Sequence, residues 1–99
     1  MKLRIQSINF DATSTLETYI NKKTSKLEKV SDDIITIDVY LKVIKPEVAS
    51  NKEAEIKLSI PGNEFFASKT CDSFEEAIDL SVDALEKQII KFKEKSMNK

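Results

Sequence analysis

The chain has 99 residues, of which 40% are apolar, and its formal net charge is −1, with one cysteine and no histidine. This length predicts a single domain, and no apolar run approaches the roughly 20 residues of a membrane span. The first residues lack the unbroken apolar region of a secretory signal, and one cysteine cannot form an internal disulfide, so we expect a cytoplasmic protein.

The first two predicted elements are a strand and a helix. Apolar and polar residues alternate over residues 2–6, which predicts a half-buried strand that ends or bulges near Ser7. Ser14 and Glu17 have the spacing of a capping box, and apolar residues then keep a helical period. We therefore expect a helix over residues 14–30.

Two clear strands follow the helix. Residues 35–43 alternate strictly between apolar and polar, and Pro46 stops that strand. Residues 53–60 alternate in the same way. Each of these segments therefore predicts a strand with one buried face.

A turn and a short returning strand come next. Pro61 and Gly62 fit the two central positions of a type II turn. The strand that follows, over residues 64–69, has two possible registers. Either Phe65 and Ala67 face inward, or Phe66 and Ser68 do.

The last element is a long helix. Ser73 and Glu76 form a second capping box, and an apolar stripe at helical spacing follows. We expect a helix from Phe74 to about Lys95, with residues 96–99 as a disordered tail.

These elements predict an α+β domain with the order β-α-β-β-β-α, spanning residues 1–99. The first helix crosses over between two parallel strands, and the last three strands form a meander. Each helix must bury one stripe, so we expect both helices on one face of a four-stranded sheet. The other face is expected to meet water and to carry Thr36, Asp38, Tyr40, Lys42, Glu53, Glu55 and Lys57.

The chain lacks most of the side chains and motifs on which enzyme active sites commonly depend. Without histidine the chain lacks the commonest general base, and with one glycine it has no phosphate-binding loop. Cys71 sits just before a helix start, where a thiol pKa can fall, but a structural cysteine is the favoured interpretation. The acids Asp72, Glu75, Glu76 and Asp79 could be metal ligands, but charges suited to a helix N-terminus explain them more simply. We therefore expect no enzyme, no metal and no cofactor.

The lysines form the strongest functional pattern. Lys22, Lys26 and Lys29 line one side of the first helix with Lys23 beside them, and Lys87, Lys91 and Lys95 line the second helix with Lys93 beside them. Rows of ammonium groups on rigid helices suit a phosphate backbone, and both rows could border one groove. Solvated helix faces are the competing interpretation, and the residues alone leave both open.

Four segments together resemble a known family. They are Lys23-Thr24-Ser25-Lys26-Leu27-Glu28, Val39-Tyr40-Leu41-Lys42-Val43, Asp72-Ser73-Phe74-Glu75-Glu76-Ala77-Ile78-Asp79 and the stretch LEKQIIKFKEK over residues 85–95. In order and spacing they resemble the bacterial ribosome hibernation-promoting factors, also called protein Y or ribosome-associated inhibitor, in their short form. Phe74 replaces the usual tyrosine, and Ala84 stands where the family often has lysine.

The resemblance implies both a fold and a function. It implies a fold like that of double-stranded RNA-binding domains, and binding to the small ribosomal subunit and its ribosomal RNA in the channel for messenger and transfer RNA. A protein bound there inhibits translation and stabilises idle ribosomes during stress or stationary phase. The lysines that match family basic positions are Lys23, Lys26, Lys87, Lys91, Lys93 and Lys95, whereas Lys22 and Lys29 have no clear match.

The expected partners follow from this reading. We expect RNA contacts from all eight lysines, no membrane, no small-molecule substrate and a monomer when free. The alternative is a protein-binding α+β module that uses its polar sheet face to modulate a transcription sigma factor.

Overall fold

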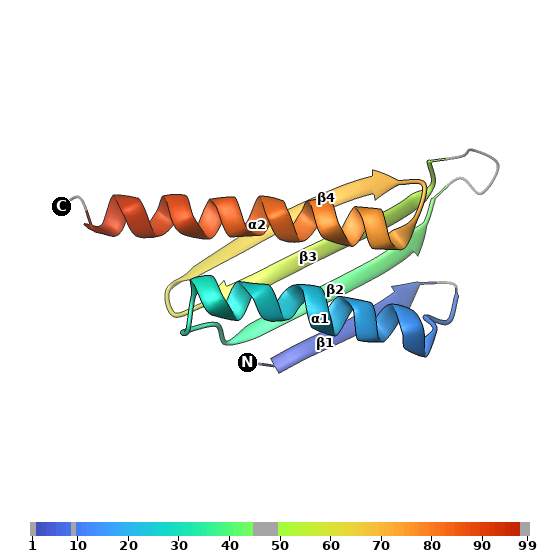
Figure 1. Cartoon of the computed structure of the whole chain (residues 1–99), viewed down its shortest axis with the longest axis horizontal. Coiled ribbons are helices and arrows are strands. Elements are labelled where there is room, and N and C mark those ends of the chain that lie inside the picture. The colour runs from blue at the N-terminus through green and yellow to red at the C-terminus, as the bar shows by residue number, and fades with distance from the viewer. Residues whose placement is uncertain (1, 9, 45–49, 98–99) are drawn as a thin grey trace.

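The computed structural model describes residues 2–8, 10–44 and 50–97, and these residues have the predicted order β-α-β-β-β-α (Figure 1). The elements are β1 (Lys2–Ile8), α1 (Ser14–Val30), β2 (Thr36–Val43), β3 (Lys52–Ile60), β4 (Asn63–Cys71) and α2 (Phe74–Met97). The sheet order is β1-β2-β3-β4, with β1 parallel to β2 and the other pairs antiparallel. Both helices cover the same face of the sheet.

The core lies between the sheet and the helices. Alternate residues of the two central strands point into it, such as Ile37 and Leu41 of β2 and Ile56 of β3, all fully buried. From the helix side, Ile20 and Leu85 are also fully buried. The alternation read from the sequence therefore identifies the buried face of the central strands correctly.

The edge strands settle two alternatives that the sequence left open. In β1, the prediction that the strand ends near Ser7 is confirmed to within one residue, because β1 ends at Ile8, and its continuous register with β2 excludes a bulge. The backbone pairing with β2 extends the strand although the apolar alternation has stopped. In β4 the first of the two registers is correct, because Phe65 and Ala67 are buried while Phe66 is 54% exposed.

One predicted helix cap is displaced by a residue. The N-cap of α1 is Thr13, whose extended backbone lets Oγ1 accept a hydrogen bond from Leu16 N at 3.1 Å, so Ser14 is already helical. Serine and threonine are both common N-cap residues, and here the adjacent Thr13 takes the position that the spacing of Ser14 and Glu17 indicated. Ser73 does cap α2, accepting from Glu76 N at 3.2 Å.

The remaining boundaries agree closely with the sequence. Gly62 has a φ of 79°, as the type II turn requires. Helix α2 continues to Met97 instead of ending near Lys95, so the predicted disordered tail does not begin at residue 96. The predicted strand stop at Pro46 and the rest of the tail, residues 98–99, lie outside the described residues.

Candidate nucleic-acid interface

Parallel packing of the two helices brings the lysines to one end of the domain. Both helices run in the same direction across the sheet (Figure 1). Tyr19 of α1 contacts Asp79 of α2, and further along Lys93 contacts Val30. The basic second half of α1 therefore lies beside the basic second half of α2. We call this the basic end, formed by Lys22, Lys23, Lys26, Lys29, Lys87, Lys91, Lys93 and Lys95.

Lys23 is held between the helices. Its Nζ lies 3.1 Å from Asp79 Oδ1 and 5.4 Å from the centroid of the Tyr19 ring. The Tyr19 hydroxyl donates to Asp79 Oδ2 at 2.7 Å. Asp79 Oδ1 is buried and accepts no hydrogen bond from the described residues, so the Lys23 ammonium compensates it by charge. Lys23 therefore joins α1 to α2.

The pKa values in this cluster follow from its geometry. Burial favours the neutral form of Asp79, but the Tyr19 hydrogen bond and the Lys23 ammonium outweigh it and lower the pKa of Asp79. The pKa of Tyr19 is raised, first by burial and then by its hydrogen bond to Asp79. The pKa of Lys23 is raised chiefly by its interaction with Asp79. Asp79 and Lys23 are therefore both ionised at neutral pH and form an ion pair.

Lys93 also bridges the helices. Its Nζ donates to the backbone carbonyl of Val30, the last residue of α1. The final carbonyls of a helix lack partners within the helix and carry a partial negative charge, so a cation there is favourable. Lys93 thus stabilises the end of the neighbouring helix.

The other six lysines of the basic end differ from these two. None of the six has an acidic side chain within 4.0 Å anywhere in the described parts of the chain, and all six are exposed. These six are Lys22, Lys26, Lys29, Lys87, Lys91 and Lys95. Their charges are available to an anionic partner, and among them Lys26 is also near enough to Asp79 to help lower the pKa of that carboxyl group.

Lys91 and Lys95 do not face the groove between the helices, although the sequence allowed both rows to border it. Lys91 and Lys95 line a hollow with Phe65 of β4, on the flank of α2 away from α1. Residues two positions apart lie about 200° apart around a helix, so Lys93 is on the opposite flank and faces α1. The cationic surface is therefore broader than a single groove.

Acids occupy the flank of α2 that faces α1. Asp79 contacts α1, and Asp83 and Glu86 follow it at four and seven positions, so they lie on the same side of the helix. The groove between the helices is accordingly mixed in charge. A phosphate backbone would be favoured over the outer surfaces of the helices instead.

The alternative chemistries of Cys71 and the acids find no support. Cys71 is buried, and burial is the main cause that raises the pKa of its thiol, so the reactive thiolate is disfavoured. Within the described residues, no group of three or more acids, cysteines or histidines is placed to hold a metal ion. Asp79 is engaged with Tyr19 and Lys23 instead.

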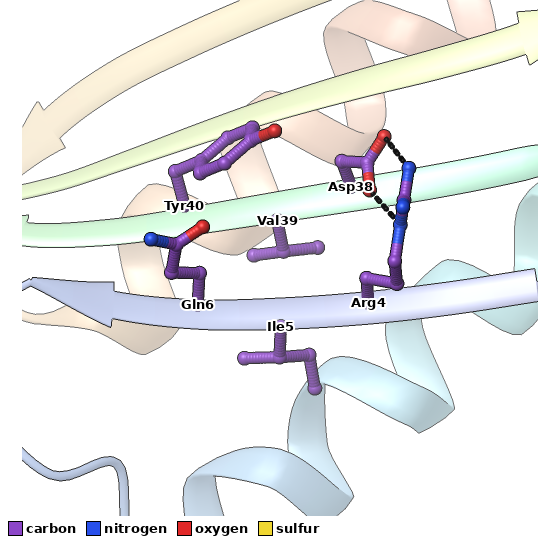
Figure 2. A pocket seen from close by; sticks show the side chains of 6 residues that line it. All are labelled: Arg4, Ile5, Gln6, Asp38, Val39 and Tyr40. Atoms are coloured by element: carbon purple, nitrogen blue, oxygen red, sulfur yellow. Dashed lines mark hydrogen bonds and ion pairs between the residues drawn. The ribbon is translucent and has the colours of Figure 1, made fainter.

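A separate hollow of about 320 Å³ lies on the uncovered face of the sheet. Figure 2 shows Arg4, Gln6, Asp38 and Tyr40 on the same side of β1 and β2. Asp38 is buried there, unlike its predicted wet surroundings, because Arg4 Nε lies 2.6 Å from its Oδ1 and Arg4 Nη2 lies 3.1 Å from its Oδ2. This hydrogen-bonded pair raises the pKa of Arg4. Arg4 and Asp38 neutralise each other's charge, and the pair lies on the face of the sheet opposite the helices.

No helix in the described part of the chain is both long and apolar enough to cross a bilayer.

Fold and charge together define a small α+β domain in which two parallel helices carry their lysines at one end. Comparison with known proteins gives the family. The family described as "Sigma 54 modulation protein / S30EA ribosomal protein" matches residues 3–97, and the chain belongs to it. The resemblance seen in the four sequence segments is thereby confirmed.

Relatives with curated names support the same family. The ribosome hibernation promoting factor of Azotobacter vinelandii is 32% identical over 99 residues, which cover 100% of this chain and 89% of the relative. The factor of the same name from Escherichia coli K12 is 34% identical over 95 residues, covering 96% of each chain.

Solved structures confirm the fold. The N-terminal domain of Thermus thermophilus protein Y superposes with a TM-score of 0.81 at 26% identity, covering 93% of this chain and 99% of that one. A ribosomal subunit interface protein from Coxiella burnetii gives a TM-score of 0.84 at 22% identity, covering 94% and 98%.

Proposed function

We propose that this chain is a ribosome hibernation factor that binds the small ribosomal subunit and inhibits translation by occupying the channel for messenger and transfer RNA. The observation that carries the proposal is the set of six lysines at the basic end without acidic partners among the described residues. Family membership and the names of the curated relatives support it. The place of action is the cytoplasm.

The mechanism is steric occlusion with electrostatic holding. The lysines contact phosphates of ribosomal RNA, which position the domain without reading sequence. Helical RNA is recognised mainly by its shape and backbone, so few contacts to bases are needed. The domain blocks the channel by its volume, and no bond is made or broken. Six phosphate contacts give a slope of roughly −4 to −5 for log affinity against log salt concentration.

The test is co-sedimentation of the purified chain with purified small subunits over a range of salt concentrations. Replacing Lys87, Lys91 and Lys95 by glutamine removes three of the six contacts, so the slope should become shallower by roughly 2 to 3. The matched control replaces Lys2, Lys42 and Lys69, which are exposed on the strands and lose the same charge. Equal loss of binding in both triple variants, or a wild-type slope near zero, would refute the electrostatic mechanism.

Modulation of transcription is the competing function, and the family description also names sigma 54 modulation. The curated relatives cited above carry ribosome hibernation names, so we do not propose it for this chain. A pull-down that recovers transcription proteins but no ribosomes, and that resists RNase, would reverse this choice.

A further inference from the structure

The flank of α2 that faces β4 contains a shallow hollow of about 280 Å³. Its lining residues are Phe65, Gln88, Lys91, Phe92 and Lys95. The Phe65 and Phe92 rings meet edge to face, with centroids 5.5 Å apart and planes at 76°. Gln88 fixes the helix to the sheet here, because its Nε2 donates to the Phe66 carbonyl at 2.9 Å. The floor is therefore apolar, aromatic and anchored.

The charged residues that line the hollow are both lysines. Lys91 and Lys95 are exposed, have no acidic partner among the described residues and stand one helical turn apart, about 6 Å along the axis. None of the lining residues is acidic. Phe92 is 37% exposed and lies beside these two lysines, on the side of α2 nearer the sheet, which leaves an aromatic surface uncovered next to two cations.

We propose that this hollow holds one unstacked nucleotide of single-stranded RNA. The base stacks on the exposed part of the Phe92 ring, and Lys91 and Lys95 contact the phosphates on either side of it. An aromatic ring beside cations is the arrangement by which proteins bind single-stranded nucleic acid without reading sequence. The inference rests on the proposed function and assigns to that surface a contact that phosphate binding alone does not include.

An acidic, apolar peptide segment fits the hollow less well. An extended peptide would need free backbone groups on the edge of β4 to add as a strand. The Phe66 carbonyl already accepts a hydrogen bond from Gln88, so that position of the edge is occupied. Stacking of a flat base requires no such groups, and the aromatic floor supplies the stacking surface.

Fluorescence tests the stacking directly, since the chain has no tryptophan. The variant Phe92→Trp places a single indole in the hollow, and a uridine hexanucleotide should quench its emission saturably. Phe66→Trp is the matched control and should not be quenched, because Phe66 is 54% exposed and alternates with the buried Phe65 and Ala67, which places it on the uncovered face of the sheet. Absence of quenching at position 92, equal quenching at both positions, or equal quenching of Phe92→Trp by polyglutamate would overturn the inference.

A second measurement uses the small subunit itself. Phe92→Leu keeps the hollow apolar and every charge in place, yet loses the stacking surface. Affinity for the subunit should fall at least about fivefold with an unchanged salt slope. Phe66→Leu should leave affinity unchanged.

The outcomes separate the two proposals. If Phe92→Leu binds like wild type while the lysine triple variant binds poorly, nucleotide stacking fails and the proposed function stands. If wild type itself does not bind the subunit, the proposed function fails. Circular dichroism melting of each variant confirms that any loss of binding occurs in a folded protein.

Discussion

The two flanks of α2 carry lysines from one short stretch of sequence, but the lysines have different roles. On the flank facing α1, Lys93 binds the Val30 carbonyl, and Asp79 on the same flank holds Lys23. On the flank facing β4, Lys91 and Lys95 have no acidic partners among the described residues and border an aromatic hollow. The difference shows that the role of a lysine depends on which element its flank of α2 faces. Spacing along the sequence does not decide whether the lysine contacts the protein itself or remains available to a partner.

The two flanks keep their different surroundings only if the buried stripe of α2 holds the helix firmly on the sheet. Leu85→Ala should then lower the free energy of unfolding by about 2–5 kcal/mol, because Leu85 is fully buried. Leu80→Ala, on the same helix but at a 42% exposed position, should change it by less than about 0.5 kcal/mol. Urea denaturation measures both, and similar losses would contradict a single buried anchor.

The sharpest test of the two flanks uses paired variants of equal charge. Lys91→Gln with Lys95→Gln removes two phosphate contacts and should weaken binding to small subunits about 20-fold at physiological salt. Lys23→Gln with Lys93→Gln should weaken binding less, and should lower the melting temperature because the bridges between the helices are lost. Co-sedimentation and thermal melting separate the two effects. If the two pairs exchanged their phenotypes, our assignment of the flanks would be reversed.

The α1-facing flank can be weakened without changing any charge. Tyr19→Phe removes the hydroxyl that donates to Asp79 Oδ2 at 2.7 Å. The free energy of unfolding should fall by about 1 kcal/mol, the usual net value of such a hydrogen bond. Affinity for the subunit should stay near that of wild type. A loss of affinity with unchanged stability would place Tyr19 in the contact surface instead.

The smallest expected effect is the pH dependence of the same cluster. Because the pKa of Asp79 is lowered in the folded state, its ionised form adds stability at pH values above the unfolded pKa of about 3.9. That stability is lost as the pH falls through the folded pKa. Urea denaturation at pH 7, 5 and 3 should therefore show the difference between wild type and Asp79→Asn shrinking at pH 3. The difference should not exceed about 1 kcal/mol even at pH 7, because the Asp79 side chain is 40% exposed. A difference that grew on acidification would contradict the direction of the shift.

The sequence predicted most of the fold because its local signals agree with one another. The apolar period of α1 and the strict alternation of β2 gave their positions to within one residue, and both helices lie on the predicted face. Pairing between strands that are far apart in the sequence determined the features that local patterns left open. The end of β1 depends on hydrogen bonds to β2, and the choice of Phe65 over Phe66 depends on register with β3.

The candidate surface was only partly predictable. The identities of the lysines and their rows follow from spacing, and the RNA-binding role of all eight remains a prediction. Their division into bridging and available groups does not follow from spacing, because Lys23 and Lys93 find partners on the other helix, far away in sequence. The aromatic hollow does not follow from the sequence, because Phe92 has the helical spacing of the apolar stripe. Its position between Lys91 and Lys93 in the sequence was the available signal.

The change of sign along α2 has a consequence beyond any single contact. Its first half carries acids and no base, its second half carries four lysines against two acids, and the basic half of α1 points the same way. A protein of net charge −1 thus carries a large electric dipole. Salt screens charges beyond roughly 8–10 Å. Within that distance a polyanion attracts the basic end of the domain and repels the acidic end. Collisions are therefore steered into one orientation, which raises the association rate without making the whole protein adhere to every nucleic acid it meets.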